Sequence, residues 1–132
     1  RAQSKGDVDD ALGLVRDALS EADGVQWAAV KIEGLDMQGL RELSARVKSL
    51  GDDLAVALLG IADGGVPFMV LSQGAAQDRR LVAGQLAKEL GARVGGGGGG
   101  RTDAGQGQGS KPEAVDDALA WVSGRIQETL GV

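Results

Sequence analysis

The side chains with the greatest chemical potential directly follow an uninterrupted run of six glycines. Residues 95–100 lead into Arg101, Asp103 and Gln106, and Gln108 follows two residues later. A guanidinium can bind a phosphate through two parallel hydrogen bonds, while amide groups can bond to sugars and base edges. The segment is therefore a candidate anion-binding site. Another interpretation stays open, in which Arg101 only pairs with Asp103 and Gln106 only bonds to the local backbone.

The composition limits the chemistry that such a site can support. The 132 residues include neither cysteine nor histidine. Disulfides, thiol nucleophiles, Ser-His triads and metal sites that need these side chains are therefore excluded within the chain. An ATPase-type phosphate loop is disfavoured because Ser110 precedes Lys111 instead of following it. We expect no catalytic residue, no metal ion and no cofactor.

The distribution of charge singles out the same region. The net charge of −5 argues against a protein that binds nucleic acid non-specifically, because such proteins are normally basic. Residues 79–111, however, contain six cations and two anions, a local charge of +4. This asymmetry predicts a focused anion site in which Arg79, Arg80 and Lys111 join Arg101. Chance clustering of surface charge explains the same pattern about equally well.

The elements before the glycines read as a crossover followed by a hairpin. Residues 25–33 alternate like a strand, Asp36 is placed to cap a helix that ends at Gly51, and residues 54–62 form a continuous apolar run typical of a buried strand. Two strands joined by a helix in this way should be parallel. The Asp63-Gly64-Gly65 turn then predicts an antiparallel strand over residues 66–72.

Helices and one short strand complete the predicted fold. Helical spacing of apolar residues predicts an amphipathic helix over residues 7–22, a second helix over 77–90 and a final helix that starts at a capping box formed by Ser110 and Glu113. Residues 92–94 read as a short strand. The sum is a single-domain α/β fold with a mixed sheet, parallel plus an antiparallel hairpin, packed with helices in two or three layers.

The predicted organisation places the glycines between a strand and a helix. We expect an N-terminal helix in residues 1–24 and a globular domain in residues 25–132, with a glycine-rich loop at 95–109. Phosphates commonly bind where a loop meets the N-terminus of a helix, because free N–H groups and the helix dipole point at them. We expect the loop to be mobile in the free domain. A flexible linker is the other interpretation of so many glycines.

A family resemblance rests on the glycine-rich segment. Residues 95–109 resemble the G-G-x-G-G-G-R-P-D-x-A-Q-G-G-G segment near the C-terminus of alanyl-tRNA synthetases. The glycine pairs match, as do Arg101, Asp103, Gln106, Gly107 and Gly109. The sequence departs from this pattern at Thr102, Gly105 and Gln108, where proline, alanine and glycine are usual. The predicted order of elements also resembles the C-terminal DHHA1-type domain of that family, so the resemblance covers nearly the whole chain.

The resemblance implies a non-catalytic tRNA-binding domain of an alanine-tRNA ligase. In that family the domain reaches the outer corner of the L-shaped tRNA and helps aminoacylation and editing to act on one bound tRNA. The implied partners are an alanine-specific tRNA and the remaining domains of the synthetase. The implied contacts, with the nearby cations added, are Gly98, Gly99, Gly100, Arg101, Asp103, Gln106, Lys111, Arg79 and Arg80.

Two other functions remain open. Related domains accompany the catalytic domain of DHH-type phosphoesterases, where the loop helps to hold a substrate phosphate. A third hypothesis is a dimerisation module that uses the apolar stripes of residues 8–19 and 115–130. The chain lacks an apolar run of transmembrane length and a signal-peptide pattern, which favours the cytoplasm. Arg1 in place of methionine suggests a fragment or a processed chain.

Overall fold

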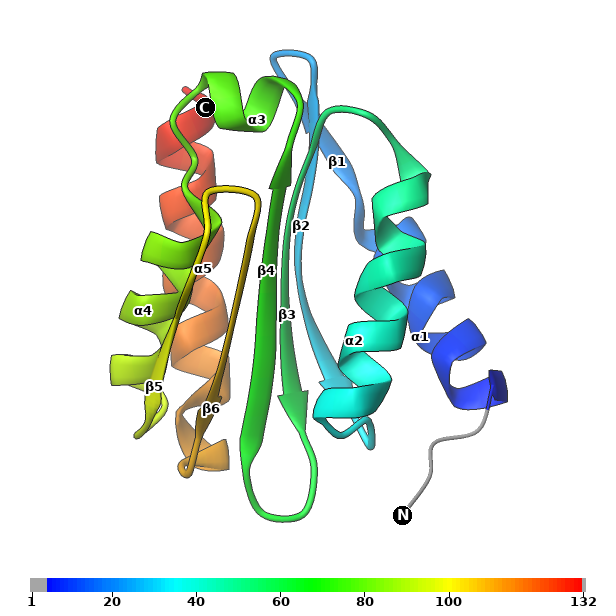
Figure 1. The fold of residues 1–132 in the computed structure, drawn as a ribbon, viewed down its shortest axis with the longest axis vertical. Helices are drawn as coiled ribbons and strands as arrows, with labels where there is room; N and C mark the ends of the chain where they lie inside the picture. The colour runs from blue at the N-terminus through cyan, green and yellow to red at the C-terminus, as the bar shows by residue number, and fades with distance from the viewer. Residues whose placement is uncertain (1–4, 132) are drawn as a thin grey trace.

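The computed structural model describes residues 5–131, which form three layers (Figure 1). One mixed sheet of six strands lies between two pairs of helices, in the strand order β1-β2-β3-β4-β6-β5. The elements are α1 (Lys5–Ala18), β1 (Ser20–Ala22), β2 (Val25–Glu33), α2 (Met37–Val47), β3 (Leu54–Ile61), β4 (Val66–Gln73), α3 (Ala75–Asp78), α4 (Ala83–Arg93), β5 (Gly97–Gly100), β6 (Ala104–Gly109) and α5 (Val115–Leu130). Short 3-10 turns at Lys48–Leu50 and Pro112–Ala114 follow α2 and precede α5.

The centre of the sheet confirms the predicted crossover and hairpin. β2 and β3 are parallel, and β3 and β4 are antiparallel. The caps and turns behave as their residue types require. The Asp36 carboxylate accepts a hydrogen bond from the Gly39 N–H at 2.9 Å. Asp63 and Gly64 both have positive φ, 52° and 75°, which is the geometry of a two-residue hairpin turn.

Two apolar cores cover the two faces of the sheet. β3 is buried from Leu54 to Leu59 because its alternate side chains serve different cores. Val56 and Leu58 face α1 and α2, whereas Ala57 and Leu59 face α4 and α5. Figure 1 shows these helix pairs on opposite sides of the strands. The fold is therefore a three-layer sandwich, the larger of the two architectures that the sequence predicts.

The first and last helices bury their apolar stripes within the chain. Val8 and Val15 of α1 are fully buried against the α2 side of the sheet. Val122 and Ile126 of α5 are fully buried on the opposite side. The dimerisation hypothesis thus loses the apolar surfaces on which it depended. α1 also ends at Ala18 instead of residue 22, since the next residues pair with β2 as β1.

The region before the glycines differs from the prediction. The helix expected over residues 77–90 is divided into α3 and α4, because Arg80 adopts a left-handed conformation with φ of 64° and turns the chain between them. The strand expected over residues 92–94 is wrong, since these residues form the end of α4 and its C-cap. The predicted capping box is also wrong. The Ser110 hydroxyl donates to the Gly95 carbonyl at 2.9 Å, and α5 has no side-chain cap.

Candidate functional site

The glycine-rich segment is a β-hairpin at the edge of the sheet. β5 pairs with β6 in antiparallel register, from Gly97 opposite Gln108 to Gly100 opposite Gly105. β6 in turn pairs with β4, with Gln106 opposite Met69. The predicted loop is therefore wrong: the segment consists of two strands and a short turn at residues 101–103. We call this unit, residues 97–109, the glycine hairpin.

One face of the glycine hairpin lies directly on α4. A Cβ atom added to Gly98 would lie 2.5 Å from the Ala87 carbonyl oxygen of α4 and 2.9 Å from Phe68 Cζ. The glycines of α4 are equally constrained, since a Cβ on Gly84 or Gly91 would collide with the backbone of β5. Glycine on both sides lets a helix and a strand approach backbone to backbone. This contact explains why side chains are missing from half of the hairpin.

The other face of the glycine hairpin is open. Gly99 lies opposite Gln106, which lies opposite Met69, so these residues share the α2 side of the sheet. An added Cβ at Gly97 or Gly99 would meet no atom within 4 Å, and neither residue has a positive φ. Packing and backbone conformation therefore do not explain glycine at these two positions.

Backbone hydrogen bonds anchor the tip of the hairpin. The Gly84 N–H donates to the Arg101 carbonyl at 2.7 Å, the Ala83 N–H donates to the Thr102 carbonyl at 3.0 Å, and the Ser72 N–H donates to the Asp103 carbonyl at 2.9 Å. The first N–H groups of α4 are thus already satisfied by protein. The start of the final helix, where the sequence suggests a phosphate site, lies near Gly95, at the end of the hairpin remote from Arg101.

Arg101 projects from this anchored tip into solvent. Its side chain is 79% exposed, and its Nε lies 3.3 Å from Asp103 Oδ1. The local salt bridge left open by the sequence therefore exists. An exposed ion pair of this kind is worth little in water, and it leaves the outer nitrogens of the guanidinium accessible. Arg101 can exchange Asp103 for a stronger anion at small cost.

A hollow of about 330 Å³ lies beside Arg101 on the open face. Its lining includes Gly99, Gly100, Gln106, Met69 and Ala104. Gln106 Oε1 accepts a hydrogen bond from Arg41 Nε of α2 at 3.5 Å, so this amide does not bond to the local backbone as the alternative interpretation required. Sequence reasoning missed Arg41, because no local pattern indicates which side of α2 faces the hairpin.

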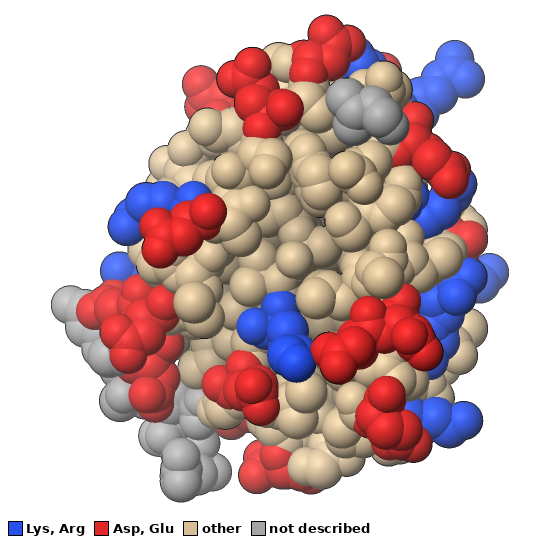
Figure 2. Space-filling view, turned by 180° about the vertical axis from the view of Figure 1, so that it is seen from behind, with Lys and Arg blue, Asp and Glu red and all other residues tan. Residues whose placement is uncertain are grey.

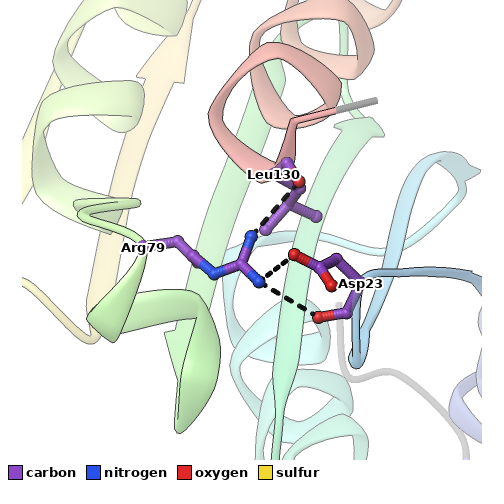
Figure 3. A network of polar contacts seen from close by, with 3 residues as sticks. All are labelled: Asp23, Arg79 and Leu130. Carbon is purple, nitrogen blue, oxygen red and sulfur yellow. Dashed lines mark hydrogen bonds and ion pairs between the residues drawn. The ribbon is translucent and has the colours of Figure 1, made fainter.

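The other predicted cations do not join this site. Arg79 connects parts of the fold, because its guanidinium pairs with the Asp23 carboxylate and donates to the Leu130 carbonyl at 3.3 Å (Figure 3). Arg80 lies in the turn between α3 and α4, close to Arg125. Lys111 lies at the far end of the hairpin, where its stem covers Gly95. The local charge of +4 is thus spread over several surfaces.

The face of the molecule opposite the glycine hairpin carries both acidic and basic side chains. Figure 2 shows mostly red, acidic side chains, with fewer blue, basic ones among them, around a broad uncharged area. Arg93, the remaining arginine of the basic stretch, lies over the Trp121 ring at 4.1 Å.

Within residues 5–131, no group of three or more His, Cys, Asp or Glu side chains is arranged to hold a metal ion. Among the helices described, none has the length and apolarity needed to span a membrane.

Comparisons with known proteins agree with the fold and the motif. The DHHA1 domain model matches residues 24–128. An alanine–tRNA ligase of Carboxydothermus hydrogenoformans is 38% identical over 114 residues, which cover 83% of this chain and 12% of the relative. The chain therefore spans about an eighth of the length of the relatives that it matches.

Solved structures share the same architecture. The C-Ala domain of Aquifex aeolicus alanyl-tRNA synthetase superposes with a TM-score of 0.71 at 21% identity, over 86% of this chain and 98% of that domain. The DHH domain of a member of the s1p family of ribosomal proteins superposes less well, with a TM-score of 0.52 at 16% identity over 90% of this chain and 30% of that one. The chain belongs to the DHHA1 domain family, and its similarity to alanine–tRNA ligases confirms the resemblance indicated by residues 95–109.

Proposed function

We propose that the chain is a tRNA-binding domain of an alanine–tRNA ligase, without catalytic activity of its own. The observation that carries this proposal is the exposed guanidinium of Arg101 on a hairpin tip whose backbone is fixed by three hydrogen bonds. A fixed backbone presents the charge without a large entropic cost on binding. The similarity to alanine–tRNA ligases over 83% of the chain supports an alanine-specific tRNA as the proposed RNA.

The shape of the site favours a folded RNA over a flexible single strand. Single-stranded nucleic acids bind mainly by stacking their bases on aromatic side chains. The hollow beside Arg101 has no aromatic residue among those that line it. Phosphates, sugars and exposed base edges of a structured RNA are better suited to a surface of backbone, amide and guanidinium groups. We infer that the domain recognises the outer corner of the tRNA.

In the parent enzyme the domain acts as a tether. A tRNA held at its outer corner stays bound while its acceptor end moves between the sites of aminoacylation and editing, which belong to other domains. Such a tether raises the effective concentration of the acceptor end at both sites. The proposed compartment is the cytoplasm. The role as an accessory domain of a phosphoesterase has less support, because the DHH neighbour shares only 16% identity with this chain.

Replacing Arg101 with alanine tests the proposal. We expect the Arg101→Ala domain to bind alanine tRNA about 1 to 3 kcal/mol more weakly, the usual loss for a charge-assisted contact. Fluorescence anisotropy of labelled tRNA at low salt measures the affinity. Lys88→Ala is the control, because Lys88 is exposed on the outer side of α4 and carries the same charge. Equal affinity of Arg101→Ala and the unmodified domain would contradict the proposal.

A second comparison separates shape from sequence. The same domain is titrated with folded alanine tRNA, with another folded tRNA and with an unstructured RNA of equal length. Recognition of the outer corner predicts similar affinity for the two folded tRNAs and weaker binding of the unstructured RNA. Preference for the unstructured RNA would refute the shape argument.

A further inference from the structure

We propose that Arg41 of α2 is a second RNA-contact residue, so that the RNA backbone crosses the open face of the glycine hairpin between Arg41 and Arg101. This inference rests on the proposed RNA-binding function and specifies which side of the hairpin the RNA uses. It also extends the site to a helix about 60 residues earlier in the chain, outside the glycine-rich motif.

The two faces of the hairpin differ in the room that they offer. On the α4 side, Gly98 is in contact distance of the Ala87 backbone and Phe68, so nothing can enter between hairpin and helix. On the α2 side, the hollow of about 330 Å³ is bounded by Gly99, Arg101 and Gln106. A ligand that contacts both Arg101 and the strands of the glycine hairpin must therefore approach from the α2 side.

The packing of α2 directs Arg41 towards Gln106, which lines this hollow. Leu40 and Leu43 of α2 are fully buried, and the buried Ser44 hydroxyl lies 3.2 Å from Met69 Sδ. Met69 is the cross-strand neighbour of Gln106. Since Arg41 lies three residues before Ser44, the two share one face of α2, and Arg41 Nε reaches Gln106.

Arg41 also keeps its charge available. Within residues 5–131, its hydrogen-bonding partner is the neutral amide of Gln106, and no ion pair of Arg41 is found. Arg46 on the same helix differs, because it forms an ion pair with Asp9 of α1. A guanidinium whose contact is a neutral amide keeps an uncompensated charge, which suits a phosphate ligand.

The chemistry of the open face fits a phosphodiester chain. Arg101 lines the hollow, and Arg41 supplies a second cation where it contacts Gln106 of the lining. Gln106 supplies an amide for a ribose hydroxyl. Gly99 lines the hollow and has no side chain, so a sugar-phosphate backbone can lie directly against β5. This arrangement accounts for glycine at a position where packing within the protein does not require it.

Four matched variants of the domain test the proposal: Arg41→Ala, Arg101→Ala, Lys88→Ala and Gly99→Val. We expect Arg41→Ala to weaken binding of folded alanine tRNA about 5- to 50-fold at low salt and to reduce the slope of log affinity against log salt by about one. Gly99→Val fills the hollow without removing a charge, so it should weaken binding and leave the salt slope unchanged. Lys88→Ala should retain the affinity of the unmodified domain. Thermal unfolding of each variant reports whether the fold is intact.

The outcomes separate this proposal from the function on which it rests. If Arg101→Ala weakens binding but Arg41→Ala and Gly99→Val do not, the RNA contacts the hairpin tip and the proposed path over the open face is wrong. If the unmodified domain does not bind tRNA, or Arg101→Ala changes nothing, the proposed function itself fails. If Lys88→Ala weakens binding as much as Arg41→Ala, the effect is one of net charge and the assignment of Arg41 is overturned.

Discussion

Adjacent glycines of β5 should respond in opposite ways to the same substitution. Gly98 faces α4, whereas Gly99 faces the open side of the sheet. Gly98→Ala and Gly99→Ala each add one methyl group to neighbouring positions of one edge strand. Comparing the stability of the two variants therefore shows how a methyl group on the α4 side differs from one on the open side.

The structure sets the size of the difference. At Gly98 the new Cβ would lie 2.5 Å from a backbone carbonyl oxygen of α4, which cannot rotate away as a side chain could. α4 must move outward, and overpacking of this kind costs about 1 to 3 kcal/mol. At Gly99 the new Cβ meets nothing within 4 Å. Alanine there should raise the free energy of unfolding by about 0.5 to 1 kcal/mol, because glycine loses more backbone entropy in a strand.

Thermal unfolding followed by circular dichroism measures both effects. A loss of 1 to 3 kcal/mol corresponds to a Tm lower by roughly 4 to 12 °C for a domain of this size, and Gly99→Ala should match or exceed the Tm of the unmodified domain. Both transitions should be reversible and concentration-independent for the comparison to hold. Equal Tm values for Gly98→Ala and Gly99→Ala would refute the contact between α4 and the hairpin.

Two further predictions concern Arg79 and the dependence of tRNA affinity on salt. Arg79→Ala should lower the free energy of unfolding by about 1 kcal/mol without changing tRNA affinity, because the Arg79 contacts with Asp23 and the Leu130 carbonyl link the β1–β2 turn to the end of α5. Chemical denaturation and fluorescence anisotropy on the same sample measure the two quantities. A loss of affinity without a loss of stability would place Arg79 in the RNA site. The slope of log affinity against log salt should be shallower than about −5, because a chain of net charge −5 engages few phosphates, and a steeper slope would contradict the small number of phosphate contacts.

Most of the central fold could be predicted because its signals are carried by side chains. β2 begins and ends at the predicted residues 25 and 33, and the Asp36 cap and the Asp63-Gly64 turn form as their residue types require. In these segments the local preference and the packing of the sheet agree. The family resemblance was likewise carried by specific side chains, Arg101, Asp103 and Gln106.

The wrong predictions concern segments without side chains and residues whose side chains make a contact that the local sequence does not indicate. β5 consists only of glycine, so it has no alternation of apolar and polar residues from which a strand could be predicted. Ser110 has the sequence of a helix cap, but its hydroxyl is used to hold Gly95. Arg41 could not be connected with the hairpin, because the contact depends on how α2 lies across β4. Each of these features depends on tertiary packing that no local window of sequence contains.

The composition of β5 also affects how the domain behaves in a crowded solution. β5 is the outermost strand of the sheet, so one row of its backbone N–H and C=O groups has no strand beside it. Exposed edges of this kind can recruit strands from other molecules and start aggregation. A tetraglycine edge offers no side chains for the interdigitated contact that stabilises stacked sheets, and glycine has low preference for extended structure. The glycines that leave the proposed RNA site open thus also disfavour growth of this edge into a larger sheet.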